Sequence, residues 1–145
     1  PRKYRAYRRG DIIVSLAGIA VNIGLFLICA ALFAVSGLLG GLLPGLTGSA
    51  GIFQQMMITG MWLNLILAFF NLLPIPPLDG SHVFYHLLPP GWGLQYRQLQ
   101  SLGFIPVIVF VYFLPGAREL YLWPARELMQ AALSIVGGFA VGVPS

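Results

Sequence analysis

The sequence predicts an all-α membrane protein with about three to four transmembrane segments and a proline-broken helix at its working site. The 145 residues are 58% hydrophobic and only 8% charged, whereas soluble domains carry about 25% charged residues. Between Asp11 and Arg97, the only carboxylate or basic residue apart from histidines is Asp79. A water-soluble surface cannot be built from such a chain, so we expect the lipid bilayer to be its solvent.

The chain begins with a basic cluster ahead of the first apolar run. Five of its eight Lys and Arg residues lie there: Arg2, Lys3, Arg5, Arg8 and Arg9. Basic residues beside a membrane segment mark its cytoplasmic end and bind anionic headgroups. The net charge of +4 therefore indicates a cytoplasmic N-terminal segment and not nucleic-acid binding. Because the chain opens on Pro1 and lacks the features of a signal peptide, we expect it to be a fragment.

Two apolar runs are long enough to cross the bilayer. Residues 12–43 carry no charge, which exceeds the ~20 residues that one helical crossing needs. We expect this helix to end near Gly37, since glycines and prolines favour a turn beyond it. The following stretch, up to Gly51, is then a non-cytoplasmic loop. Residues 53–73 form the second run, which returns the chain to the cytoplasmic side.

A proline cluster ends the second run. Pro74, Pro76 and Pro77 lack the backbone N–H group and force extended geometry on the residues before them, so the helix must break. A short helix is expected over residues 81–88, capped by Asp79 or Ser81. Residues 95–100 suit a membrane interface.

Residues 102–114 and 128–143 are two further apolar segments, each short for a full span. Four charged residues separate them: Arg118, Glu119, Arg126 and Glu127.

The lone carboxylate of Asp79 needs an explanation. An aspartate in a membrane helix costs about 2.5 to 3.5 kcal/mol, so it is by default paired, metal-bound or facing water. A salt bridge to Arg97 or to the N-terminal basic cluster is one alternative, and a helix-capping role is another. Asn71, one turn before the break, either hydrogen-bonds freed carbonyl groups or orients a ligand. A helix break beside a lone carboxylate indicates a site.

His82 and His86 follow Asp79 at three and seven residues. On one continuous helix the three would share a face, which resembles metal-ligand spacing. However, the run HVFYH is not HExxH, because Val83 stands where that motif carries its general base. Hydrogen-bonding or interfacial roles are favoured for both histidines, with metal ligation as the lesser alternative.

The run NLLPIPPLDG resembles the signature Asn-x-x-Pro-x-Pro-x-x-Asp-Gly of the site-2 protease family of intramembrane zinc metalloproteases, especially its short bacterial members. The matching residues are Asn71, Pro74, Pro76, Asp79 and Gly80. Upstream, LAGIAVN is similar to the family's Ala-Gly-Pro-x-x-Asn helix at Ala17, Gly18 and Asn22, with Ile19 where proline is usual.

This resemblance implies an enzyme that hydrolyses peptide bonds in or near the membrane with one Zn²⁺ per active site. It implies Asp79 as the third zinc ligand, beside two histidines of an HExxH motif whose glutamate activates water. Residues 1–145 contain no HExxH. We therefore expect a single transmembrane peptidase-like domain that forms the C-terminal part of a longer protein and is inactive alone.

The expected location is the cell membrane, crossed several times, and the expected partners are lipid and a transmembrane or membrane-proximal protein substrate. Two other functions remain open. The chain could be an inactive scaffold that binds transmembrane partners through the broken helix. It could also be a proton or cation pathway that uses Asp79 and the two histidines.

Overall fold

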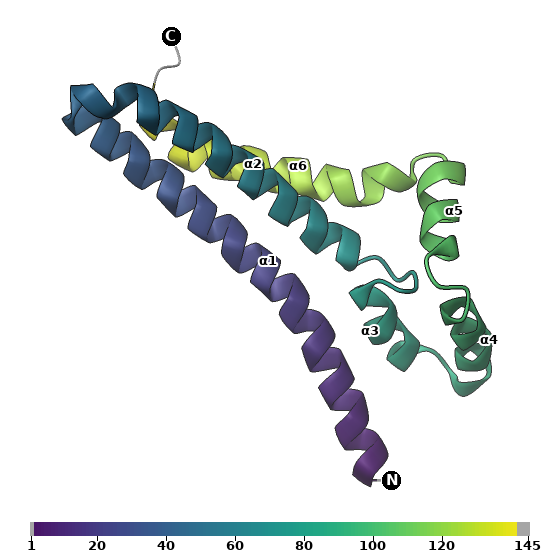
Figure 1. Ribbon diagram of the computed structural model, residues 1–145. Helices are drawn as coiled ribbons and strands as arrows, with labels where there is room; N and C mark the ends of the chain where they lie inside the picture. The colour runs from purple at the N-terminus through teal and green to yellow at the C-terminus, as the bar shows by residue number, and fades with distance from the viewer. Residues whose placement is uncertain (1, 142–145) are drawn as a thin grey trace. The chain divides into compact units, whose positions relative to one another are not determined.

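The computed structural model describes residues 2–141, with the side chains of residues 2–8 and Pro90 outside the description (Figure 1). Every regular element in this range is helical, which confirms the all-α class. The elements are α1 (Arg2–Leu42), η1 (Pro44–Leu46), α2 (Thr47–Asn71), α3 (Asp79–Leu87), α4 (Pro90–Gln100), α5 (Ile105–Phe113), α6 (Ala117–Val136) and η2 (Gly137–Phe139).

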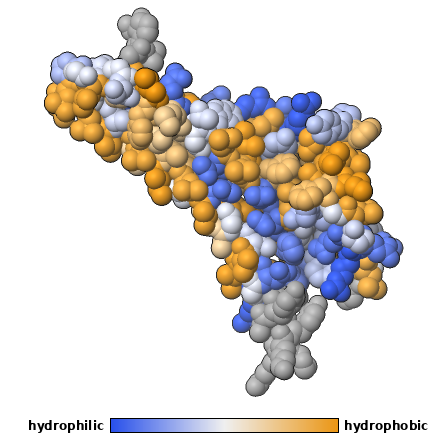
Figure 2. All heavy atoms as spheres, in the orientation of Figure 1, coloured by the Kyte–Doolittle hydropathy of each residue, from blue (hydrophilic) through white to orange (hydrophobic). Residues whose placement is uncertain are grey.

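Two of these helical stretches are long and apolar enough to cross a membrane, Arg9–Leu42 and Pro44–Asn71. A strongly bent pair, Ile105–Phe113 with Ala117–Phe139, gives a third span if it is counted as one crossing. Figure 2 shows apolar residues over the outward faces of α1 and α2 near their connecting turn. Apolar side chains on the outside of a helical protein indicate that lipid covers them, which supports a membrane protein.

The chain divides into two compact units. One comprises Pro1–Val21 and Leu67–Leu122, and the other comprises Asn22–Ile66 and Trp123–Ser145. The first contains the proline break and the candidate site. The second contains the turn between α1 and α2 together with the end of the described chain.

Polar side chains in the second unit are satisfied locally, as a membrane-embedded unit requires. Gln54 is buried, and its Nε2 donates to the carbonyl groups of Phe33 at 3.1 Å and Phe139 at 2.8 Å. Its Oε1 accepts from the backbone N–H of Val141 at 2.9 Å. Asn64 donates to the carbonyl group of Gly60 within α2, at 2.8 Å. Gln54 therefore fastens the end of the described chain to α1 and α2.

The expected end of the first helix near Gly37 is wrong. Helix α1 continues to Leu42, and α2 begins at Thr47, so the connection is much shorter than predicted. Two glycines in this stretch, Gly37 and Gly40, lie within α1 and serve close packing. A methyl group on Gly37 would collide with the carbonyl oxygen of Phe139, and one on Gly40 would lie 2.9 Å from Ala50 Cβ. Small residues let membrane helices approach closely.

The last two apolar segments lie in two separate helices, α5 and α6, but the second helix begins before residue 128. Their four dividing charges, Arg118, Glu119, Arg126 and Glu127, all lie within α6, which contains Pro124 in its interior. The turns lie earlier, at Gly103 and Gly116, whose φ angles are 59° and 78°. Glycine adopts this left-handed backbone conformation without strain. Helix α6 therefore contains the charged residues that separate the two apolar segments in the sequence.

Candidate functional site

The proline break begins where α2 ends, at Asn71, and continues to the start of α3 at Asp79. The backbone between them is held by short-range turns. The N–H of Ile75 donates to the carbonyl group of Leu73 at 2.9 Å, and the N–H of Leu78 donates to that of Ile75 at 2.9 Å. The sequence prediction of a helix broken at the prolines is therefore correct.

Apolar packing fixes the break. Leu73 and Leu78, on either side of the prolines, are buried together with Val107 of α5. Partly buried apolar residues surround them: Phe70, Ile75, Phe110, Val111 and Tyr121. Such a cluster makes the break a packed element and not a loose loop.

A hydrogen bond from α4 also holds the break. The Tyr96 hydroxyl donates to the carbonyl oxygen of Pro74 at 2.6 Å. Burial raises the pKa of Tyr96 to about 12, so the hydroxyl remains a donor well beyond neutral pH. The nearby Ser81 hydroxyl lowers this pKa in part, although its Oγ makes no well-formed hydrogen bond in the described structure. Helix α4 therefore braces the backbone directly before the candidate site.

Gly80 permits the tight packing of α3 against the end of α2. A methyl group at this position would collide with the carbonyl oxygen of Leu72 and would lie 2.7 Å from that of Leu73. Both obstacles are backbone atoms, which cannot rotate away. A glycine is thus required beside Asp79 for steric reasons, independently of any chemistry.

Asp79 is the first residue of α3 and is partly buried. The predicted capping role is wrong, because Leu78 is the N-cap and no side chain caps this helix. The position in the first turn still favours a negative charge, since the helix dipole is positive there. On α1, the backbone of Gly18 lies so close that a methyl group there would be 2.9 Å from Asp79 Oδ2.

The structure assigns Asp79 no hydrogen bond or ion pair with any described side chain. The predicted alternative partner Arg97 instead lies over the ring of Tyr85, with Cζ 5.8 Å from the ring centroid. The other alternative, the basic cluster at residues 2–9, lies almost entirely outside the described side chains. A partly buried carboxylate that is not committed to a partner suits a ligand-binding role.

The two histidines after Asp79 converge on a different carboxylate. His86 Nε2 lies 3.0 Å from Asp11 Oδ2, and His82 Nδ1 lies 3.4 Å from the same oxygen. Among the described residues, no group of three or more His, Cys, Asp or Glu side chains has an arrangement that could hold a metal ion. The hydrogen-bonding role predicted for His86 therefore has direct support.

A shallow cleft lies against the break. Its volume is about 260 Å³, and its lining is almost wholly apolar. The residues are Leu16, Leu72, Pro74, Gly80, Val83, Phe84 and Leu87. It therefore places an apolar surface next to the Asp79-Gly80 pair.

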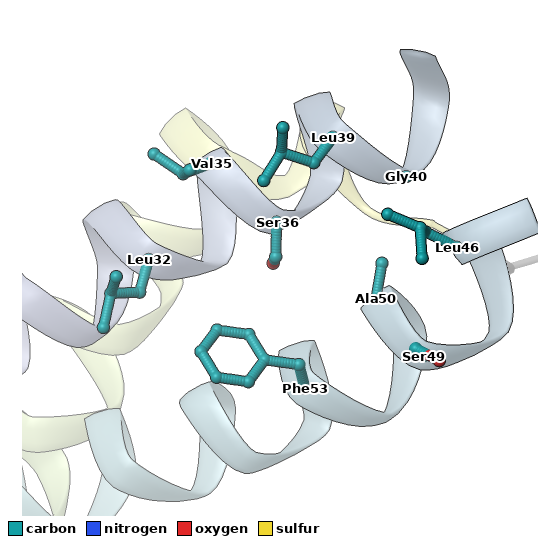
Figure 3. Close-up of a pocket in the computed structure, with 9 residues that line it drawn as sticks. All are labelled: Leu32, Val35, Ser36, Leu39, Gly40, Leu46, Ser49, Ala50 and Phe53. Carbon is teal, nitrogen blue, oxygen red and sulfur yellow. The ribbon is translucent and has the colours of Figure 1, made fainter. Parts of the chain in front are cut away.

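A larger apolar groove of about 450 Å³ lies in the second unit, beside the turn between α1 and α2 (Figure 3). Its lining combines small residues with leucines and Phe53, whose ring lies in the space between α1 and α2 in Figure 3. It contains no group with acid, base or metal-binding chemistry, and so the candidate site is the break at Asp79.

Sequence reasoning identified the break and Asp79 but missed two contacts. Gly18 was named only as part of the LAGIAVN run, and Asp11 only as the charge before the first apolar run. The structure places Gly18 against Asp79 and Asp11 against the two histidines. Asn71 is the last residue of α2 and is partly buried, and its role remains a prediction.

Comparisons with known proteins agree with the resemblance predicted from the motif. Residues 45–113 match the model of Peptidase family M50, and this segment includes the break and Asp79. The chain is also similar to "Putative zinc metalloprotease YwhC" of Bacillus subtilis (strain 168), with 34% identity over 128 residues. That match covers 85% of this chain and 54% of the relative, so the chain spans about half the relative's length. No solved structure gives a significant match.

Proposed function

We propose, from the match to Peptidase family M50 and the similarity to the Bacillus subtilis relative, that this chain is the Asp79-bearing part of an intramembrane zinc metalloprotease of the site-2 protease type. The intact protein then hydrolyses peptide bonds in or near the membrane. The observation that carries this proposal is the packed proline break, which ends at a partly buried Asp79 with no partner among the described side chains.

Asp79 fits the role of one zinc ligand. Its carboxylate is of a type that binds zinc at about 2.0–2.2 Å, and it lies at a helix start where the backbone is rigidly packed. Zinc bound there would supply a water activated near neutral pH and polarise the peptide carbonyl group. The two remaining protein ligands and the general base are assigned to an HExxH helix outside residues 1–145, so this chain alone should be inactive.

The break serves substrate binding in this proposal. A transmembrane substrate is helical, and its peptide bonds are hidden until the helix unwinds. The turn-held backbone around Pro74 to Pro77 offers carbonyl groups that accept hydrogen bonds from an unwound segment, and Asn71 orients that segment. The apolar cleft beside Gly80 provides contact for side chains that leave the lipid.

The topology follows from charge and span order. The basic N-terminal cluster lies in the cytoplasm, α1 crosses the cell membrane outward and α2 returns. This arrangement places the break near the cytoplasmic face. Lipid and a membrane-embedded protein substrate are then the partners of the site.

The test uses the full-length polypeptide that contains this chain, reconstituted in lipid vesicles with a transmembrane substrate. Cleavage that requires zinc, together with loss of both cleavage and zinc in the Asp79→Asn variant, is the expected result. Retained zinc and cleavage in that variant would overturn the zinc role of Asp79. If wild type binds a transmembrane partner without cleaving it, and Asp79→Ala binds equally well, the scaffold function replaces the protease.

A further inference from the structure

Helices α1 and α3 contact each other at two positions, and the spacing between these positions is the same on both helices. On α1, Asp11 and Gly18 are seven residues apart, and on α3, Asp79 and His86 are also seven residues apart. Asp11 meets His86, whereas Gly18 meets Asp79. Seven residues are two helical turns, or about 10 Å of rise. The two helices therefore run antiparallel here, and each contact fixes the register of the other.

The Asp11 contact is the polar one of the two. An ionised carboxylate only accepts hydrogen bonds, so in this contact His86 Nε2 is the donor and Asp11 Oδ2 the acceptor. Only 5% of the His86 side chain is exposed, against 26% for Asp11. Because His86 is almost fully buried, the loss of this hydrogen bond is more costly than it would be at the surface. The pair therefore holds α3 in one position along α1.

His82 adds a weaker contact to the same oxygen. Its Nδ1 lies 3.4 Å from Asp11 Oδ2, and 40% of its side chain is exposed. Exposed pairs of this kind contribute little, because water competes for both groups. His82 is thus a natural control for His86, since it lies on the same helix and faces the same carboxylate.

We propose that Asp11 is a positioning residue that acts through His86 to place Asp79 for zinc binding. This inference rests on the proposed zinc role of Asp79. Neither Asp11 nor His86 touches substrate or zinc in this account. Their hydrogen bond sets the register of α3 on α1, and that register sets how the Asp79 carboxylate lies against Gly18.

The experiment measures zinc affinity of the full-length protein by competition with a chelator, alongside thermal unfolding. Asp11→Ala and His86→Ala should each lower zinc affinity by about 10- to 100-fold, as loss of ligand-orienting groups typically does. The double variant should lose little more than either single variant, because both changes remove one interaction. His82→Gln should bind zinc within about twofold of wild type.

A reciprocal variant separates positioning from general destabilisation. In Asp11→His with His86→Asp, the hydrogen bond is restored with its partners exchanged, and zinc affinity should recover by at least about tenfold over the single variants. If the alanine variants do not fold, Asp11→Leu and His86→Phe, which fill a similar volume but cannot form the hydrogen bond, provide the measurement.

Unchanged zinc affinity in the folded Asp11 and His86 variants would overturn the inference. So would additive losses in the double variant, since they would show that the two side chains act separately. The Asp79→Asn variant keeps this outcome distinct from failure of the proposed function. If that variant retains zinc, the zinc role of Asp79 fails; if it loses zinc while the Asp11 variants keep it, only the positioning role fails.

Discussion

Replacing Gly18 with alanine displaces the Asp79 carboxylate without altering Asp79 itself. The added methyl group would lie 2.9 Å from Asp79 Oδ2 and 3.9 Å from its Cγ. Carbon and oxygen atoms in contact normally stay about 3.3 Å or more apart. The carboxylate must therefore move by about 0.4 Å, the difference between these two distances. It can do so because it is the free end of a side chain.

The expected loss of zinc affinity follows from how little a metal site tolerates displacement of its ligands. Ligand distances in such sites are held within about 0.2 Å, so a displacement of this size weakens binding. Losses of ligand orientation typically cost 10- to 100-fold in metal affinity, and tenfold corresponds to about 1.4 kcal/mol. The helix itself should gain about 0.5–1 kcal/mol, because alanine is a better helix former than glycine. We expect zinc affinity to fall at least about tenfold while thermal stability does not fall.

The assay is chelator competition and thermal unfolding of the full-length protein in detergent. Gly10→Ala is the matched control, because Gly10 lies on the same helix and has no atom within 4 Å of its added methyl group. Equal zinc affinity in the Gly18 and Gly10 variants would refute the reasoning. A loss of stability confined to Gly18→Ala would also refute it, because the carboxylate would then be rigidly fixed and part of the packing.

Three further variants test the packing within the two units, each by unfolding of the purified protein: Gly80 and Tyr96 lie in the unit that contains the site, and Gln54 lies in the other. Gly80→Ala should destabilise by about 1–3 kcal/mol, since its methyl group collides with the backbone carbonyl of Leu72; an unchanged melting temperature would contradict this. Tyr96→Phe should cost about 1 kcal/mol through its lost hydrogen bond. The pKa of Tyr96 is raised to about 12 in the folded state, from an ordinary value near 10, so wild type should lose stability as the pH rises between these values. The phenylalanine variant should lack this loss. Equal dependence of stability on pH in the two proteins over this range would contradict the expectation. Gln54→Leu should lower the free energy of unfolding by about 1–3 kcal/mol. Gln55 is exposed, so Gln55→Leu should lower it little. Equal effects of the two changes would show that the three Gln54 hydrogen bonds do not stabilise the unit.

The helical class and the break could be predicted because they depend on local chemistry. Uncharged runs longer than a bilayer crossing form helices, and prolines without N–H groups end them. The motif around Asp79 drew attention to the site for the same local reason. The apolar runs, the prolines and the motif can each be recognised within one continuous stretch of the chain.

The helix ends near Gly37 and at the C-terminal side could not be predicted in this way. Glycine breaks helices in water but packs them closely in a membrane, and only the partner helix distinguishes these cases. Similarly, the apolar run at residues 128–143 did not show that its helix begins at Ala117 and contains all four charges. Hydrophobic runs locate an apolar face without showing how far the helix extends past it.

The contacts of Asp11 and Gly18 depend on tertiary structure. They arise from the register of α1 against α3, between residues more than 60 positions apart in the sequence. The seven-residue spacing on each helix became informative only once the two helices were seen to be antiparallel. The sequence shows these residues only as isolated positions, whereas the structure brings them together in one site.

The most direct test of the central claim is the zinc content of purified full-length protein and its Asp79→Asn variant. The exchange keeps the size of the side chain and removes its charge, so the packing against Gly18 is preserved. The account predicts about one zinc ion per chain in wild type and the loss of most of it in the variant, with folding unchanged. Equal zinc content in the two proteins would contradict the assignment of Asp79 as a ligand.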